Sequence, residues 1–202
     1  MKIWRTIREV ERWWDAGFVP TMGAFHEGHL ELMRRAKAEC GRCVVSLFVN
    51  PTQFGPNEDF SRYPRVEEQD IELAKSVGVD AIFIPTVEEM YGPETVEIHV
   101  GKIAEVWDGY YRPRHFLGVA TVVNKLFNIV GTGKAYFGLK DFQQCAVLQQ
   151  MVRGLNMPIE LRFVETIREN DGLALSSRNR YLSPELRSIA PNLYREISRV
   201  SS

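Results

Sequence analysis

Two histidines lie three positions apart in the segment Met22-Gly23-Ala24-Phe25-His26-Glu27-Gly28-His29, where a helical pattern begins. At this spacing both rings lie on one face of the first helical turn, next to free backbone N–H groups and the positive end of the helix dipole. Gly28 has no side chain that would block a flat ring or a phosphate. The segment predicts an anion site, with a capped surface helix as the alternative. A zinc-protease interpretation fails because that chemistry needs H-E-x-x-H.

A second group of polar residues suits a polyphosphate. Ser176 and Ser177 offer hydroxyl donors in a glycine-containing loop, and Arg178 offers a forked, charge-assisted contact. Lys140 and Asp141 follow an apolar run that is typical of a strand. The alternatives are a solvated turn for the serines and arginine, and a surface ion pair for the lysine and aspartate.

Two glutamines, Gln53 and Gln144, are neutral side chains that hydrogen-bond both as donor and as acceptor. Such amides suit the hydroxyl or carboxylate groups of a small polar substrate. Each could equally be bonded to the backbone of its own loop.

The elements that must position these residues follow from hydrophobic periodicity. It predicts helices over residues 6–16, 28–40, 66–77, 116–130 and 141–153, and short helices after Thr86 and Ser183. Continuous apolar runs predict strands over residues 43–49, 80–84, 95–100, 134–137 and 159–164. This alternation predicts an α/β fold with a doubly wound parallel sheet. Ligands of such sheets bind beyond the carboxyl ends of the strands, where the polar segments lie.

Composition excludes several functional classes for these 202 residues. With 25 basic and 26 acidic side chains the net charge is −1, so we expect no general binding to nucleic acid. The longest apolar runs are far shorter than the roughly 20 residues of a membrane-spanning helix. An N-terminus that mixes charged and apolar residues, together with only three cysteines, predicts a cytoplasmic protein.

Taken in order, the polar segments resemble those of one family. The matching stretches also include Asn50-Pro51-Thr52-Gln53-Phe54-Gly55, Asp59-Phe60-Ser61-Arg62-Tyr63-Pro64-Arg65 and His115-Phe116-Leu117-Gly118. Over essentially its whole length the chain resembles the pantothenate synthetase family, the pantoate–β-alanine ligases of the H-I-G-H nucleotidyltransferase superfamily. The resemblance implies a Rossmann-like domain that uses ATP to condense pantoate with β-alanine. Pantothenate, AMP and pyrophosphate form through a pantoyl adenylate, with Mg²⁺ on the ATP phosphates and a homodimer as the assembly.

The resemblance also implies site residues by motif match. ATP is expected at Met22, Gly23, His26, Gly28, His29, Gly138, Leu139, Lys140, Asp141, Ile167, Leu175, Ser176, Ser177 and Arg178. Pantoate and β-alanine are expected at Asn50, Gln53, Tyr63 and Gln144. The implied catalytic residues are His29, as the family's proton donor, and His26, Lys140 and Arg178.

Departures from the family pattern occur at three positions, where Leu139 replaces a polar residue, Leu175 a methionine and Arg114 a glycine. The last adds charge beside His115, whose role stays open. Residues 1–182 are expected to form the catalytic domain and residues 183–202 the beginning of a smaller C-terminal lid domain. The alternatives are a related nucleotidyltransferase that adenylylates a phosphate, and a nucleotide-binding fragment without activity.

Overall fold

A six-stranded, fully parallel sheet forms the centre of the computed structural model, which describes residues 1–200. The strand order is β1-β4-β3-β2-β5-β6. The strands are β1 (Lys2–Trp4), β2 (Gly17–Thr21), β3 (Cys43–Leu47), β4 (Ala81–Phe83), β5 (Lys134–Gly138) and β6 (Glu160–Val164). The order reverses its direction between β2 and β5, so a crevice is expected beyond the carboxyl ends of these neighbouring strands.

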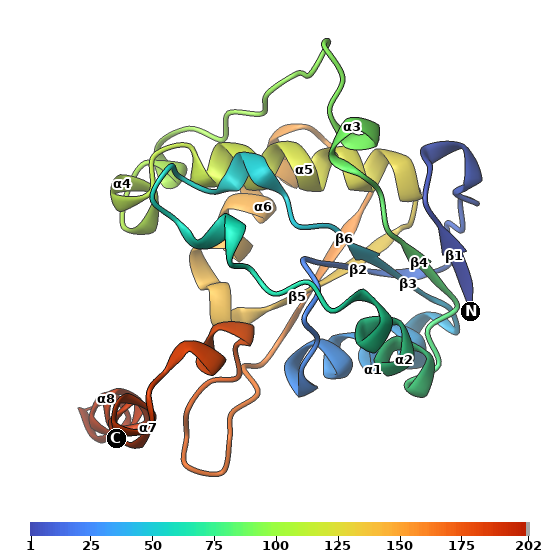
Figure 1. Cartoon of the computed structure of the whole chain (residues 1–202). Helices are drawn as coiled ribbons and strands as arrows, with labels where there is room; N and C mark the ends of the chain where they lie inside the picture. Colours follow the sequence, from blue (N-terminus) through green and yellow to red (C-terminus); the bar gives the residue numbers. More distant parts are fainter. Residues whose placement is uncertain (201–202) are drawn as a thin grey trace.

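Helices cover both faces of this sheet (Figure 1). One face packs against α1 (Glu27–Cys40) and α2 (Glu67–Ser76), and the other packs against α5 (His115–Val130) and α6 (Phe142–Gly154). The shorter helices are α3 (Val87–Met90), α4 (Asp108–Tyr111), α7 (Pro184–Ile189) and α8 (Asn192–Val200). The predicted doubly wound α/β fold is therefore confirmed.

Successive residues of each central strand enter opposite halves of the core, because side chains alternate across a sheet. In β2, Phe18 packs with α5 and α6, whereas Val19 packs with α1. Gly17 begins this strand, and a Cβ atom there would lie 2.8 Å from the Cβ of Ala36. The glycine allows the C-terminal part of α1 to approach the beginning of the strand closely.

The N-terminal prediction is wrong. In place of a helix, residues 6–16 contain one 3-10 turn, Ile7–Glu9, which follows strand β1. The Glu9 carboxylate accepts the N–H groups of Arg5 (2.6 Å) and Thr6 (3.2 Å), and this capping interaction closes only a single turn. Trp4 pairs with Phe83 in β4 and stacks edge-on against Trp13, so a tertiary contact replaces helical continuation.

The predicted strand over residues 95–100 is also absent from the structure. This segment runs over the surface without a strand partner, held by bonds such as the one from the Ile98 N–H to Thr121 Oγ1 (3.0 Å). Val96 is 74% exposed. Alternating β-branched residues therefore do not suffice for a strand in a segment that does not join the sheet.

The C-terminal helices α7 and α8 lie apart from the sheet (Figure 1). The predicted helix start at Ser183 is confirmed, since its hydroxyl accepts the Leu186 N–H. The division of the chain at residue 182 stays a prediction, and residues 201 and 202 lie outside the described part. Within residues 1–200, no helix has both the length and the apolar character needed to cross a bilayer.

Candidate active site

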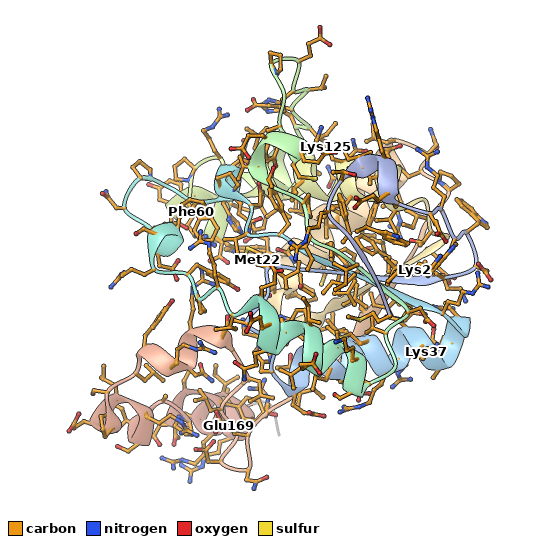
Figure 2. The ribbon with its side chains drawn as sticks, turned by 45° about the vertical axis from the view of Figure 1, so that its right-hand side comes forward. Lys2, Met22, Lys37, Phe60, Lys125 and Glu169 are labelled. Carbon is orange, nitrogen blue, oxygen red and sulfur yellow. The ribbon has the colours of Figure 1, made fainter. Side chains whose placement is uncertain are left out.

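A cavity of about 220 Å³ opens beyond the carboxyl ends of β2, β3 and β5. Its wall combines polar groups from several loops with apolar side chains of α5. The predicted residues that line it are Met22, His26, Gly28, His29, Asn50, Gln53, Tyr63, Gly138, Lys140, Asp141, Gln144, Ile167, Leu175, Ser176, Ser177 and Arg178. Met22 lies near the centre of the molecule in Figure 2. Segments far apart in sequence thus meet in one pocket, as the strand-end argument predicts.

Two predicted ATP residues do not line this cavity. Gly23 lies in the turn after β2 with φ +83°, and its N–H donates to Thr21 Oγ1 (3.3 Å). A side chain there would also meet Asp70 at 2.9 Å. The Leu139 side chain packs against the core cluster that contains α5 and α6. Both residues support the loops that carry their neighbours, and any backbone contact with ATP stays a prediction.

His26 and His29 cap the start of α1 reciprocally. Nδ1 of His26 accepts the Gly28 N–H (3.2 Å), and Nδ1 of His29 accepts the His26 N–H (3.4 Å). The two rings lie against each other at a tilt of 37°, with centroids 4.1 Å apart. Because Nδ1 of each neutral ring accepts a bond, its proton must lie on Nε2. The helix start therefore fixes two imidazole donors at the cavity wall.

The same environment keeps both rings neutral. Burial, then the charge of Lys140 and that of Arg180, lowers the pKa of His26. Burial, followed by the neighbouring His26 and Lys140, lowers the pKa of His29 to about 3. Without a bound anion, His29 is thus an uncharged hydrogen-bond donor at neutral pH.

The turn between β2 and α1 depends on a residue that the sequence did not single out. Asp70 of α2 is buried, and its carboxylate accepts the N–H groups of Ala24 (2.7 Å) and Phe25 (2.6 Å). Burial raises the pKa of this carboxyl, against the effect of those two bonds. Asp70 stands in the acidic first turn of α2, so in the sequence it resembles an ordinary solvated residue.

Gln53 stands at the end of a 3-10 turn, Pro51–Gln53, that follows β3. Its Nε2 donates to Met22 Sδ (3.2 Å), and its Oε1 accepts from Asn50 Nδ2 (3.1 Å). Helix α5 packs against this turn at Gly118, where a Cβ atom would lie 2.5 Å from the Thr52 carbonyl oxygen. Gly118 thus allows the close contact that places Gln53 beside α5.

The two adjacent glutamines of α6 have different surroundings. Gln143 is fully engaged, because Oε1 accepts the Asp108 N–H (3.1 Å) while Nε2 donates to the carbonyls of Ile103 (2.9 Å) and Val106 (2.7 Å). Gln144 lines the cavity, and its side chain makes no hydrogen bond within residues 1–200. The structure therefore separates a structural glutamine from one that is free to meet a ligand.

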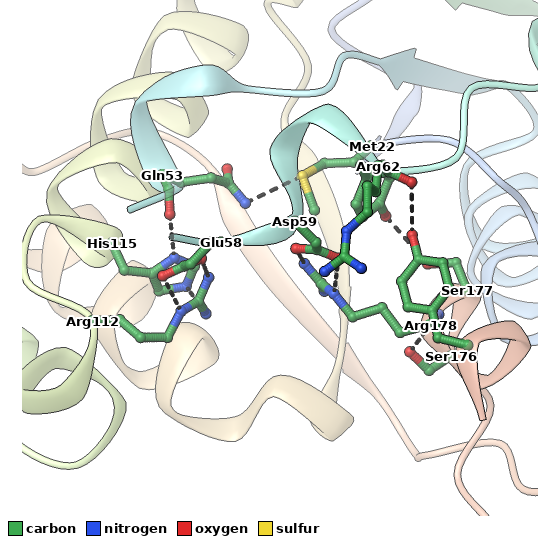
Figure 3. A network of polar contacts seen from close by, with 12 residues as sticks. Met22, Gln53, Glu58, Asp59, Arg62, Arg112, His115, Ser176, Ser177 and Arg178 are labelled. Atoms are coloured by element: carbon green, nitrogen blue, oxygen red, sulfur yellow. Dashed lines mark hydrogen bonds and ion pairs between the residues drawn. The ribbon is translucent and has the colours of Figure 1, made fainter. Parts of the chain in front are cut away.

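His115 holds the backbone of Gln53 in place (Figure 3). Its Nδ1 lies 2.9 Å from the Gln53 carbonyl oxygen, and its Nε2 lies 3.2 Å from Nη1 of Arg112. Arg112 also forms a two-bond pair with Glu58, at 3.0 and 2.5 Å. Because a guanidinium only donates, Nε2 of His115 accepts and its Nδ1 carries the proton. Burial lowers the pKa of His115 and favours this neutral form.

The unusual Arg114 precedes α5 in a left-handed conformation, with φ +73°. This region favours glycine, which agrees with the glycine expected there. Its guanidinium pairs with Glu97 on the surface. The substitution thus leaves His115 in place and adds backbone strain beside it.

Arg178 lines the cavity and is held by an acidic partner (Figure 3). Its Nε and Nη2 donate to the two carboxylate oxygens of Asp59 at 2.8 and 2.9 Å. This bond lowers the pKa of Asp59. Tyr63 and Ser177 are also within hydrogen-bonding distance, at 3.3 Å between their hydroxyls. Hydrogen bonds and an ion pair therefore join the segments around residues 59–63 and 177–181.

Lys140 and the loop after β6 complete the cationic side. Lys140 lies in the 3-10 turn after β5, and its ammonium donates to Asp141 (3.1 Å). Ile167 and Leu175 face the cavity from a loop closed by the bond from the Leu175 N–H to the Ile167 carbonyl (3.0 Å). Among residues 1–200, no three His, Cys, Asp or Glu side chains are grouped to hold a metal ion.

The parallel sheet, the histidine-capped helix after β2 and the pocket at the strand ends define a Rossmann-like domain of the nucleotidyltransferase type. A family model described as pantoate–β-alanine ligase matches residues 2–202. The chain belongs to the pantoate–β-alanine ligase family.

Relatives and solved structures agree with this assignment. The chain is 56% identical over 203 residues to the pantothenate synthetase of Chloroflexus aggregans, covering 98% of this chain and 73% of that protein. The crystal structure of pantothenate synthetase from Thermus thermophilus matches with a TM-score of 0.93 and 51% identity, over 96% of this chain and 72% of that one. The Francisella tularensis pantoate–β-alanine ligase, complexed with β,γ ATP and β-alanine, matches with a TM-score of 0.89 and 38% identity, over 96% and 78%.

Proposed function

We infer that this chain uses ATP to condense pantoate with β-alanine, giving pantothenate, AMP and pyrophosphate through a pantoyl adenylate. Family membership and the relative complexed with β,γ ATP and β-alanine support this function. The observation that carries it is a single cavity in which phosphate-binding groups face two amides and an apolar wall.

The chemistry needs activation because a carboxylate is a poor electrophile. A pantoate oxygen attacks the α-phosphorus of ATP and pyrophosphate leaves, which produces a mixed anhydride. The β-alanine amine then attacks the carbonyl carbon and AMP leaves. Holding both anions together and stabilising the charge that grows on the α-phosphate are the tasks left to the protein.

The phosphate half of the proposed site consists of donors. Lys140 and the Nε2–H groups of His26 and His29 stabilise the α-phosphate, while Arg178 and the Ser176 and Ser177 segment contact the β- and γ-phosphates. The low pKa of His29 makes the neutral imidazole the donor, and an approaching phosphate raises its proton affinity. Donation to the charge of the transition state thus needs no prior protonation.

The acid half of the proposed site is uncharged. Gln53 and Gln144 bind polar atoms of pantoate, and Phe48, Val119, Val122 and Val123 supply apolar surface for its carbon skeleton. Neutral donors bind a carboxylate without neutralising it, so the oxygen keeps its nucleophilic charge. Tyr63 also lines the cavity, and its hydroxyl lies 3.3 Å from that of Ser177.

Mg²⁺ is proposed to arrive on the ATP phosphates. The carboxylates that line the cavity are Asp141, which pairs with Lys140, and Glu165. So few protein oxygens fit a metal held mainly by phosphate and water oxygens. The metal would neutralise phosphate charge when bound.

The alternative of adenylylating a phosphate substrate would require cationic residues in the acid half. The residues there are amides and apolar side chains, which favours a hydroxy acid. Pyrophosphate release with pantoate, and none with phosphopantetheine, is the expected result. Release with phosphopantetheine alone would overturn the proposal.

A coupled AMP-release assay tests the complete reaction. We expect AMP to form at the full rate only when ATP, pantoate and β-alanine are all present, with pantothenate detected by mass. Single-turnover formation of pantoyl adenylate, also measured by mass, separates a catalyst from a nucleotide-binding fragment. A chain that binds ATP but forms neither adenylate nor pantothenate would contradict the assignment.

We further propose a homodimer located in the cytoplasm. Four large aromatic side chains near α4 are 67–80% exposed: Trp107, Tyr110, Tyr111 and Phe142. Exposed apolar patches of this kind are typical of protein–protein interfaces. The unpaired segment 95–100 is a second feature that a partner could cover. Sedimentation velocity should give a dimer for the parent and a monomer for Tyr111→Asp, whereas a monomeric parent would contradict the proposal.

A further inference from the structure

Asn50 borders the cavity, yet its amide is entirely engaged within the protein. The residue is 1% exposed. Its Nδ2 donates one bond to the Gly118 carbonyl (3.2 Å) and one to Gln53 Oε1 (3.1 Å). Since an amide nitrogen carries two hydrogens, no donor of Asn50 remains for a substrate.

The orientation of this amide is dictated by groups whose roles are unambiguous. The Thr52 N–H, which can only donate, lies 3.3 Å from Oδ1, and the Gly118 carbonyl, which can only accept, lies on the Nδ2 side. Oδ1 also accepts from Thr52 Oγ1 (3.0 Å) and from the Tyr91 hydroxyl (2.6 Å). Turning the Asn50 amide over would place donor against donor and acceptor against acceptor.

The consequence passes to Gln53. Because Asn50 presents an N–H group to it, Gln53 must turn Oε1 toward Asn50 and Nε2 toward Met22 and the cavity. The sulfur of Met22 is a weak acceptor that a carboxylate oxygen would readily outcompete. The open side of Gln53 is therefore purely a donor.

We propose that Asn50 is a positioning residue, which acts through Gln53 by fixing its amide so that the cavity meets only N–H donors. The proposal deepens the function inferred above and depends on it for the nature of the ligand. It assigns to Gln53 an acceptor oxygen of the acid, carboxylate or carbonyl, and excludes a role as acceptor for a hydroxyl proton. Tyr91 strengthens the arrangement from the far side of Asn50.

The orientation can be tested without substrate. In protein labelled with ¹³C-methyl methionine and ¹⁵N, we expect a nuclear Overhauser cross-peak between the Met22 methyl and the Gln53 side-chain N–H protons. Asn50→Asp has nearly the same shape but only acceptors, so Gln53 should turn its nitrogen toward residue 50 and the cross-peak should vanish. A cross-peak that persists in Asn50→Asp would overturn the proposal, whatever reaction the enzyme performs.

A double-mutant cycle tests the functional part. Asn50→Asp should raise the KM for pantoate by about 10- to 100-fold, the range for a buried polar group left without its partner, with the KM for ATP nearly unchanged. In a Gln53→Ala background the same substitution should change the KM by less than about 2-fold, because a residue that acts only through Gln53 has nothing left to position. Additive effects would show that residue 50 acts on pantoate without Gln53, directly or through the added charge, and would refute the proposal.

Tyr91→Phe is the milder variant in case Asn50→Asp folds poorly. It removes one of the donors to Asn50 Oδ1, so we expect a rise of about 2- to 5-fold in the pantoate KM, lost in the Gln53→Ala background. Tyr194→Phe, at an exposed site of α8 outside the cavity lining, is the matched control. An equal effect of Tyr91→Phe with and without Gln53 would contradict the chain of contacts.

Discussion

The two halves of the cavity are held in opposite ways. On the acid side, Gln53 is buried and bonded through Asn50 and His115 to groups that cannot rearrange independently. On the phosphate side, Lys140 and Arg178 are more exposed and rest on carboxylates, Asp141 and Asp59. The neutral group Gln53 is held by a closed set of hydrogen bonds, whereas the two cations pair with carboxylates and can exchange their partners.

The difference matches the two ligands proposed. A small acid offers few atoms, so selectivity needs groups that are already in place. A triphosphate brings several charges of its own and can displace carboxylates from cations as it binds. Substitutions on the acid side should therefore act on one substrate, while those on the phosphate side should act on the rate and on salt dependence.

The largest effect is expected at the phosphate side. His29→Gln keeps an acceptor for the His26 N–H while removing the imidazole, and Lys140→Ala removes the nearby ammonium. Each should lower the adenylation rate by about 10²–10³-fold, the scale for one preorganised transition-state donor. Single-turnover kinetics measures this, with Lys75→Ala on the far surface of α2 as control. Rates within a few-fold of the parent would remove these residues from the mechanism.

The adjacent glutamines of α6 provide the next test. Gln144→Ala and Gln53→Ala should each weaken pantoate binding by about 1–3 kcal/mol while ATP affinity stays nearly constant. Gln143→Ala should instead lower the free energy of unfolding, because it leaves the Ile103 and Val106 carbonyls without their donor. Calorimetry with both ligands and urea unfolding distinguish the cases. Equal losses of pantoate and ATP affinity would show that the two halves of the cavity do not bind separate substrates.

Acidification should destabilise the histidine-capped helix. The pKa of His29 is lowered in the folded state, so protons bind the unfolded chain first, and stability is lost as pH falls from about 6.5 toward about 3. One such histidine costs up to about 1.4 kcal/mol for each pH unit in that interval. Urea unfolding at pH 7.5 and pH 5.5 should show this loss, and His29→Gln should lose less. Identical pH dependence in both proteins would mean that His29 titrates normally.

Releasing Arg178 from its partner should produce a smaller effect of the opposite sign. Asp59→Asn removes a negative charge near the phosphates and frees the guanidinium fork, so ATP should bind about 2- to 10-fold more tightly at low salt. Pantoate affinity should not change. Calorimetric titrations at two ionic strengths test this, and weaker ATP binding would show that Asp59 positions Arg178 rather than competing for it.

The smallest effect is expected beside the acid half. Arg114→Gly should relieve the left-handed conformation and stabilise the fold by about 0.5–1 kcal/mol, since the exposed pair with Glu97 contributes little. Thermal unfolding measures the change, with kinetics as control for the His115 contact. Destabilisation would indicate that the contact with Glu97 matters more than the strain.

Sequence reasoning succeeded where local patterns and long elements decide the structure. The helices α1, α5 and α6 and most strands are confirmed within a few residues, and the strand-end rule brought nearly all predicted site residues to one cavity. It failed at the N-terminus, where Lys2–Trp4 forms strand β1. Three residues are too few to show the periodicity that predicts a strand. It failed again over residues 95–100, where an apolar alternation lacks a described partner.

The residues that support the site could not be predicted from local sequence patterns. Asp70, Glu58 and Tyr91 act on groups 46, 54 and 41 positions away along the chain. Each is of a type that commonly occurs on surfaces, so nothing in its local sequence indicates burial. The orientation of the Gln53 amide likewise depends on the hydrogen-bond network around it and cannot be predicted from the glutamine alone.

The close contact at Gly118 affects how the substrate specificity of the enzyme could be redesigned. The close contact at this glycine locks the register of α5 against the turn that carries Gln53, while Val119, Val122 and Val123 of the same helix form the apolar wall. Substrate scope can therefore be redesigned by trimming or enlarging the valines, at about 0.8 kcal/mol for each methylene group of the new acid that becomes buried. The helix keeps its position through Gly118, so a library built on the wall should leave the proposed contact between Gln53 and the carboxylate intact.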